Sequence, residues 1–117
     1  MPATADLTAV EARLRAVLVP YDGPLEWATI YGNPMLRRPG ARAHHWFAFV
    51  KPASKHVSLF LLPVHTWPDL RDGMSPALAR RLTGKSAFNF TAIDEVEMAE
   101  LEALVARAFD RYMAGAA

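Results

Sequence analysis

Residues 45–62, HWFAFVKPASKHVSLFLL, decide the fold. Two runs rich in aromatic and aliphatic side chains, 45–51 and 56–62, are joined by the short turn Pro52-Ala53-Ser54. Aromatic and β-branched residues favour strands, and two such runs separated by a brief turn are typical of an antiparallel hairpin. The sequence therefore predicts a β-hairpin at the centre of the chain.

Both faces of this hairpin carry apolar side chains. Strict alternation along the first strand places Phe47 and Phe49 on one face and Trp46, Ala48 and Val50 on the other. Leaving such side chains in water forgoes about 1.5–3 kcal/mol each. We therefore expect cover on both faces: helices on one and, on the other, a loop, the segment 66–73 or a second copy of the chain. The sequence predicts either a homodimer or a well-covered sheet.

The flanking segments complete an α+β fold. Apolar residues at helical spacing predict a helix over 4–18 and another that begins at Asp94 and continues to about Met113. Further strands are expected at 26–31, 35–38 and 87–91, and Pro39-Gly40 is the pair that a type II turn favours. The prediction is one domain, 1–117, with an antiparallel sheet of four to five strands. An N-terminal helix, short helices before the last strand and a long C-terminal helix accompany the sheet.

The segment Gly84-Lys85-Ser86 resembles the end of a phosphate-binding loop. Such a loop needs an earlier glycine at position 79, where this chain has Ala79, and a strand before it. Ser75-Pro76 instead has the pattern of a helix start, and strong helix formers follow. We interpret Gly84 as a helix C-cap, which would leave Lys85 to neutralise the carbonyl groups of that helix end.

Composition limits the class of protein. The chain has 117 residues, is 52% apolar and contains no cysteine, so disulfides, cysteine-bound metals and thiol catalysis are excluded. Its longest apolar runs are far shorter than the ~20 residues of a membrane helix, and the N-terminus lacks the pattern of a signal peptide. These features predict a cytoplasmic protein that does not enter a membrane.

Charge is unevenly distributed, although the net value is only +1. Residues 37–91 hold nine basic and two acidic groups, whereas residues 92–117 hold two basic and six acidic groups. We expect the basic groups to solvate the surface and to pair with the acidic C-terminal helix. Nucleic acid is not predicted as a partner, because the chain is not strongly basic and no RNA- or DNA-binding motif is present.

Three motifs resemble those of the YdhG-like family, a family of unknown function. Tyr31-Gly32-Asn33-Pro34 resembles its Y-G-x-P motif, and His56-Val57-Ser58-Leu59 is similar to its H-[IV]-S-L strand. Residues 78–90 resemble S-P-x-L-x-x-R-x-x-G-K-S-C-F-N-F of one branch, with Ala87 in place of the cysteine. The resemblance extends over about residues 25–112. It implies a compact α+β domain comparable with frataxin, and one member of the family has been described as an iron chaperone.

A small-anion pocket is the binding site that the residues suggest. Its predicted members are the groups near the hairpin ends and the last strand: Tyr31, Lys51, His56, Lys85, Ser86 and Asn89. The alternative is that Lys85 serves the helix end and that Ser86 and Asn89 only satisfy backbone groups. Either way, the function predicted is that of a binding or accessory protein.

Neither catalysis nor a resident metal or cofactor is predicted. His44 and His45 are adjacent and would point to opposite faces of a strand, and no H-x₃-H or H-E-x-x-H pattern occurs. No nucleophile elbow or S-x-x-K motif is present. The alternative function is a frataxin-like iron-binding chaperone, which would use the acidic cluster of the last helix: Asp94, Glu95, Glu97, Glu100 and Glu102.

Overall fold

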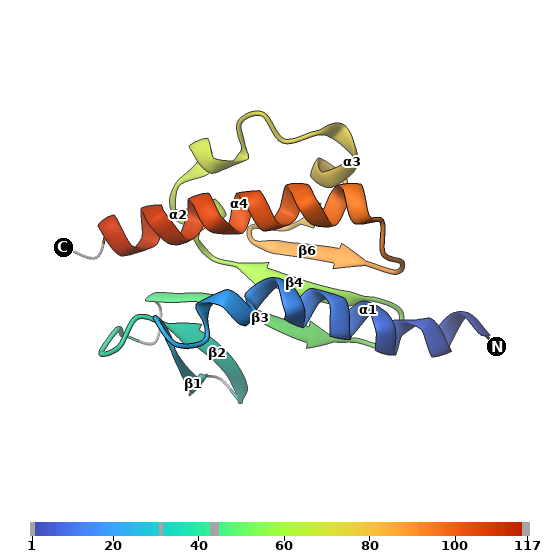
Figure 1. The fold of residues 1–117 in the computed structure, drawn as a ribbon, viewed down its shortest axis with the longest axis horizontal. Coiled ribbons are helices and arrows are strands. Elements are labelled where there is room, and N and C mark those ends of the chain that lie inside the picture. The colour runs from blue at the N-terminus through green and yellow to red at the C-terminus, as the bar shows by residue number, and fades with distance from the viewer. Residues whose placement is uncertain (1, 31, 43–44, 116–117) are drawn as a thin grey trace.

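The computed structural model describes residues 2–30, 32–42 and 45–115 of the chain. Within that part, the strands form one antiparallel sheet in the order β1-β2-β3-β4-β6-β5. Their bounds are β1 Glu26–Ile30, β2 Asn33–Arg37, β3 Trp46–Pro52, β4 Val57–Leu61, β5 Leu82–Thr83 and β6 Ala87–Phe90. The helices α1 Pro2–Leu18 and α4 Glu95–Ala114 lie side by side against one face of the sheet (Figure 1).

Short helical segments connect these elements. They are η1 Val19–Tyr21 after α1, and α2 Pro63–Thr66, η3 Pro68–Arg71 and α3 Pro76–Ala79 between β4 and β5. The α+β prediction is confirmed, with six strands rather than four to five. The additional strand is β5, whose two residues are too few to produce any periodicity in the sequence.

The main hydrophobic core lies between the sheet and the two long helices. The helices contribute buried stripes that include Leu14 and Val17 from α1, and Met98, Leu101 and Val105 from α4. The sheet contributes the side chains of cross-strand pairs: Val50 with Leu59, Leu59 with Phe88, and Val57 with Phe90. The main-core residues of each long helix thus lie on one face of that helix, and the main-core residues of each strand lie on one face of the sheet.

The alternation predicted for the first hairpin strand is wrong at its start. Leu36 pairs with Ala48 but Arg37 pairs with Trp46, so Phe47 is an extra residue in β3. A bulge of this kind places two successive side chains on the same face. Phe47 therefore joins Ala48 in the main core, and Trp46 joins Phe49 on the opposite face.

No described element covers that opposite face, which we call the open face of the sheet. Its apolar part consists of Ala28, Met35, Trp46, Phe49 and Phe60. The rings of Phe49 and Phe60 stack at 4.5 Å between centroids, and Met35 and Phe49 are buried by their neighbours. The segment 66–73, one of the expected covers, packs against α4 instead, where Asp69 forms an ion pair with Arg111. Lateral packing of the side chains thus replaces part of the expected cover.

The interpretation of Gly84 as a helix C-cap is also wrong. Helix α3 ends at Ala79, and Gly84 directly follows the strand β5. Thr83 pairs with Ala87, so residues 84–86 form the tip of a hairpin, and Gly84 supplies the positive φ of +64° that the turn requires. The element after the turn is the strand β6, so the geometry is still not that of a phosphate-binding loop, in which a helix follows.

The start of α4 follows the predicted pattern. The Asp94 side chain accepts hydrogen bonds from the backbone N–H groups of Val96 and Glu97, which have no partner within the helix. None of the described helices combines the length and the apolar character that crossing a bilayer requires.

Candidate functional site: a cavity beside Tyr112

The five described residues among the six predicted for an anion pocket do not meet at one place. Lys51 pairs with Ser58, and Ser58 pairs with Asn89, so these three lie in one row across the open face. His56 is half-buried and comes just before β4 at the same end of the sheet. Tyr31 lies outside the described residues.

Lys85 and Ser86 lie toward the other end of β4. The backbone oxygen of Ser86 accepts a hydrogen bond from the N–H of Leu61, five residues along from His56. At about 3.3 Å per residue, the separation is roughly 17 Å. Lys85 is exposed in the hairpin turn, and the strand β5 lies between it and the end of α3 along the chain.

Ser58 and Asn89 of this row already have hydrogen-bond partners. The hydroxyl of Ser58 donates to Oδ1 of Asn89, and Nδ2 of Asn89 donates to Oγ1 of Thr83 at 3.3 Å. The functional groups of Asn89 are therefore engaged on both sides. This arrangement favours a structural role for Asn89 over ligand binding.

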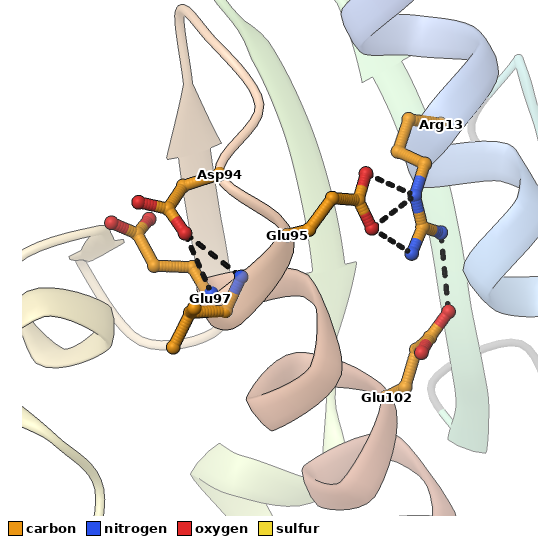
Figure 2. A network of polar contacts seen from close by, with 6 residues as sticks. Arg13, Asp94, Glu95, Glu97 and Glu102 are labelled. Carbon is orange, nitrogen blue, oxygen red and sulfur yellow. Dashed lines mark hydrogen bonds and ion pairs between the residues drawn. The ribbon is translucent and has the colours of Figure 1, made fainter.

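The acidic cluster of α4 is engaged as well. Figure 2 shows Arg13 of α1 between two carboxylates, with Glu95 at 2.9 Å and Glu102 at 3.1 Å. Glu97 forms an ion pair with Arg81, and Glu100 accepts hydrogen bonds from Ser75. Among the described residues, no group of three or more His, Cys, Asp or Glu side chains could hold a metal ion. The expected pairing of the middle segment with α4 is seen in Arg81, whereas Arg13 comes from the first helix.

Replacing Arg13 should raise the pKa of Glu95. The hydrogen bond from Arg13 holds that pKa below its ordinary value of 4.5. The stabilisation due to this pair is therefore present above pH 4.5 and is lost as the pH falls through the lower pKa of the folded state. Arg13→Met should return the midpoint toward the ordinary value, measured by NMR titration of the side-chain carboxyl carbon. Arg15→Met, which breaks a pair with Glu11, is the control; an unchanged Glu95 midpoint in Arg13→Met would contradict the ion pair.

A cavity of about 320 Å³ lies at the C-terminal end of helix α4. Figure 1 shows this helix in orange to red. The cavity is bounded by the loop after β2, the start of β3, helix α2 and the last turns of α4. We call it the Tyr112 cavity; its lining residues are Arg38, His45, Trp46, Leu62, Pro63, Thr66, Trp67, Tyr112 and Gly115. These lining residues include two tryptophans, a tyrosine and an arginine but no Asp or Glu.

Local structure explains how these residues come together. Pro39-Gly40 forms the expected turn, in which the N–H of Ala41 donates to the oxygen of Arg38 and Gly40 has a φ of +81°. The chain then returns to β3 through His45. Helix α2 follows directly after β4, and the N–H of Leu62 donates to the oxygen of Phe47. The sheet therefore holds α2 beside the start of β3.

Tyr112 connects α4 to the loop between β2 and β3. Its hydroxyl accepts a hydrogen bond from the backbone N–H of Arg38 at 2.9 Å and donates one to the backbone oxygen of His45. The side chain is 5% exposed, and burial raises the pKa of Tyr112, although the nearby Arg38 and Arg37 partly offset this effect. The phenol thus stays protonated and keeps both ends of the loop in place.

Trp67 forms the wall of the cavity next to the end of α4. The guanidinium of Arg111 lies over its indole at 5.4 Å from the ring centroid and forms an ion pair with Asp69. A Cβ atom on Gly115 would lie 2.6 Å from Cζ2 of Trp67. The glycine therefore allows the indole to pack directly against the helix end.

Sequence reasoning did not identify this cavity. The sequence pattern places Trp46 on a face of the hairpin, Arg38 at the end of a strand and Tyr112 near the end of the last helix, and none of these positions indicates a cavity. The one signal was the aromatic and basic content around residues 38–46, which does not reveal that α2 and α4 close the other sides.

Comparison of the chain with protein-family models, curated proteins and solved structures found no match. The likeness to the YdhG-like family stays a resemblance of three motifs.

Proposed function

We propose that the protein is a binding or accessory protein that holds a small anionic molecule with a flat apolar part in the Tyr112 cavity. The environment of the Arg38 side chain is the observation that supports this proposal most. This side chain is half-buried and lines the cavity, and its guanidinium lies over the Tyr112 ring at 5.3 Å from the centroid. No described carboxylate or carbonyl accepts a hydrogen bond from that guanidinium.

The other half-buried arginines differ from Arg38 in this respect. The guanidinium groups of Arg13, Arg37, Arg81 and Arg111 form ion pairs with carboxylates, and that of Arg71 donates to the backbone oxygen of Val64. Removing a charge from water is unfavourable unless an opposite charge or hydrogen bonds compensate for it. A bound carboxylate or phosphate would provide both for Arg38, because a guanidinium binds such groups through paired N–H donors.

The size and the remaining lining support a ligand of metabolite size. Cavities of about 300–1,000 Å³ that are largely apolar and contain a few polar groups are the usual form of small-molecule sites, and the Tyr112 cavity, at about 320 Å³, lies at the small end. The rings of Trp67 and Tyr112 offer flat apolar surface, and Trp46 adds to the lining at the start of β3. Thr66 lies at the exposed rim and can hydrogen-bond to a polar substituent.

This proposal keeps the anionic ligand that the sequence suggested but places it at Arg38 rather than at Lys85. The frataxin-like iron chaperone is the less favoured alternative, because the carboxylates of α4 are already engaged with Arg13, Arg81 and Ser75.

Calorimetry with small model anions tests the proposal. We expect phenyl phosphate and benzoate to bind, and benzyl alcohol, which lacks the charge, to bind much more weakly. Arg38→Met keeps an unbranched side chain but removes the hydrogen bonds to the anion, so affinity should fall about tenfold or more. Arg80→Met is the matched control, because Arg80 is exposed and does not line the cavity.

Further variants separate the competing sites. Lys85→Ala should leave the binding unchanged; loss of binding in that variant, with Arg38→Met unaffected, would place the anion at the β5–β6 turn. Titration with ferrous ion under anaerobic conditions completes the comparison. Heat from ferrous ion together with none from the anions would favour the iron-binding alternative.

A further inference from the structure

Strand β1 forms an open edge of the sheet. It is the terminal strand in the sheet order, and no described element lies beyond it at the lower edge of the sheet in Figure 1. The opposite edge is different, because β5 has only two residues and leads at once into a hairpin turn. Only β1, with the five residues Glu26–Ile30, is long enough to add another strand.

The β1 edge carries none of the usual protection. Proteins block edge strands with lysine, proline, bulges or inward-pointing charges, because unpaired backbone groups invite another strand. The sequence of β1, EWATI, contains no lysine or proline, and its pairing with β2 is regular throughout. Its one charged residue, Glu26, is already in an ion pair with Arg37 at 2.8 Å. The strand is therefore neutral and available to a partner.

The pairing with β2 shows which backbone groups of β1 face the open edge. Thr29 is opposite Pro34, which has no N–H to donate. Thr29–Pro34 is therefore a non-hydrogen-bonded pair. Antiparallel ladders alternate between hydrogen-bonded and non-hydrogen-bonded pairs, so Trp27–Leu36, two residues along, is also a non-hydrogen-bonded pair. The N–H and C=O groups of Trp27 and Thr29 therefore point away from β2, toward the edge.

We propose that two copies of the chain pair through β1, antiparallel and centred on Ala28. In this register Trp27 of each copy is opposite Thr29 of the other copy. The outward N–H and C=O groups of Trp27 then face those of Thr29. Each of these pairs exchanges two backbone hydrogen bonds. Ala28 meets Ala28 at the two-fold axis in a non-hydrogen-bonded pair, where side chains come closest and a small residue fits.

The side chains at this edge support a second copy as the occupant. Trp27 is 44% exposed and Val19 is 65% exposed, and both line a hollow of about 150 Å³ on the helix side of the edge. In the proposed register the two Trp27 side chains occupy diagonal positions on that same side, within reach of one another. The match arises because the outward backbone groups of β1 are complementary to those of a second β1. Any extended strand offers outward backbone groups in this alternation, so the feature that favours a second copy is its Trp27, which brings a second exposed indole to the same side of the edge.

Sedimentation equilibrium over a range of concentrations tests the interface. The wild-type chain should show a monomer–dimer equilibrium. Thr29→Pro removes the outward N–H of Thr29 but no hydrogen bond to β2, so the variant should keep its circular dichroism spectrum and melting temperature. Its dimer dissociation constant should nevertheless rise by about tenfold or more, because both copies lose a hydrogen bond. Thr29→Val keeps the N–H and is the matched control, which should dimerise like the wild type.

The outcomes decide the proposal in either direction. A wild-type monomer at all concentrations overturns it, and so does a dimer that Thr29→Pro does not weaken, since that dimer would use the open face or another surface. Trp27→Lys is a second variant, placing a charge at the edge without altering the backbone. Weakening in both Thr29→Pro and Trp27→Lys, with Thr29→Val unaffected, supports pairing through β1.

Discussion

Phe47→Ala is expected to lower the free energy of unfolding by about 3–5 kcal/mol, the usual range for removing a fully buried aromatic ring. Phe47 is 0% exposed, and its ring centroid lies 5.7 Å from that of Tyr21, 5.9 Å from Phe109 and 5.3 Å from Tyr112. These three residues come from η1 and α4, while Phe47 is held by the bulge in the sheet. The surrounding elements are therefore anchored separately and cannot easily collapse into the space.

Urea unfolding followed by circular dichroism measures this effect. Phe60→Ala is the matched control, because Phe60 belongs to the open face and is only half-buried, so its loss should be clearly smaller. If Phe47→Ala does not fold, Phe47→Leu should still fold and show a measurable loss of stability. Equal losses in Phe47→Ala and Phe60→Ala would show that the bulge does not place Phe47 in the main core.

Tyr112→Phe is expected to cost about 2–4 kcal/mol of stability, although it removes a single oxygen atom. The hydroxyl both donates to the oxygen of His45 and accepts from the N–H of Arg38. Two backbone groups would lose their partner, and because the site is only part-buried each should cost about 1–2 kcal/mol, the lower part of the usual range for an unsatisfied group. Because these groups belong to the two ends of one loop, the Tyr112 cavity should also bind model anions less tightly.

Tyr112→Phe should also change how the free energy of unfolding depends on alkaline pH. Burial raises the pKa of Tyr112 above the ordinary value of 10.0, so the folded state holds this proton more tightly than the unfolded state does. The corresponding stability is fully present below pH 10 and is lost as the pH rises through the higher folded pKa. Tyr112→Phe should reduce this alkaline loss. A residual dependence should remain, because burial and the nearby Asp110 and Glu102 also raise the pKa of Tyr21.

Tyr21→Phe is the matched control for the hydrogen bonds. The hydroxyl of Tyr21 makes no hydrogen bond to a described residue, so its removal should leave stability near neutral pH almost unchanged. Urea unfolding at neutral and alkaline pH compares the two variants directly. A neutral-pH loss as small for Tyr112→Phe as for Tyr21→Phe would contradict the loop-holding role of the Tyr112 hydroxyl.

The sequence by itself determined the elements that have a strong local pattern. The two long helices follow from apolar residues at helical spacing, and the start of α4 follows from the capping aspartate Asp94. The central hairpin and the Pro39-Gly40 turn follow from side-chain type and from the φ preferences of proline and glycine. In these elements the local preference and the tertiary fold agree, so a single sequence is informative.

The tertiary structure alone decided which face Phe47 occupies, what Gly84 does and where the cavity lies. A bulge depends on how β2 and β3 meet, and β5 exists only because it pairs with β6. The glycine preference for positive φ is the same in a helix end and in a hairpin turn, so residue type could not distinguish the two. The Tyr112 cavity joins residues 38, 67 and 112, which are far apart in the chain. Their meeting depends on long-range packing, which leaves no local pattern in a sequence.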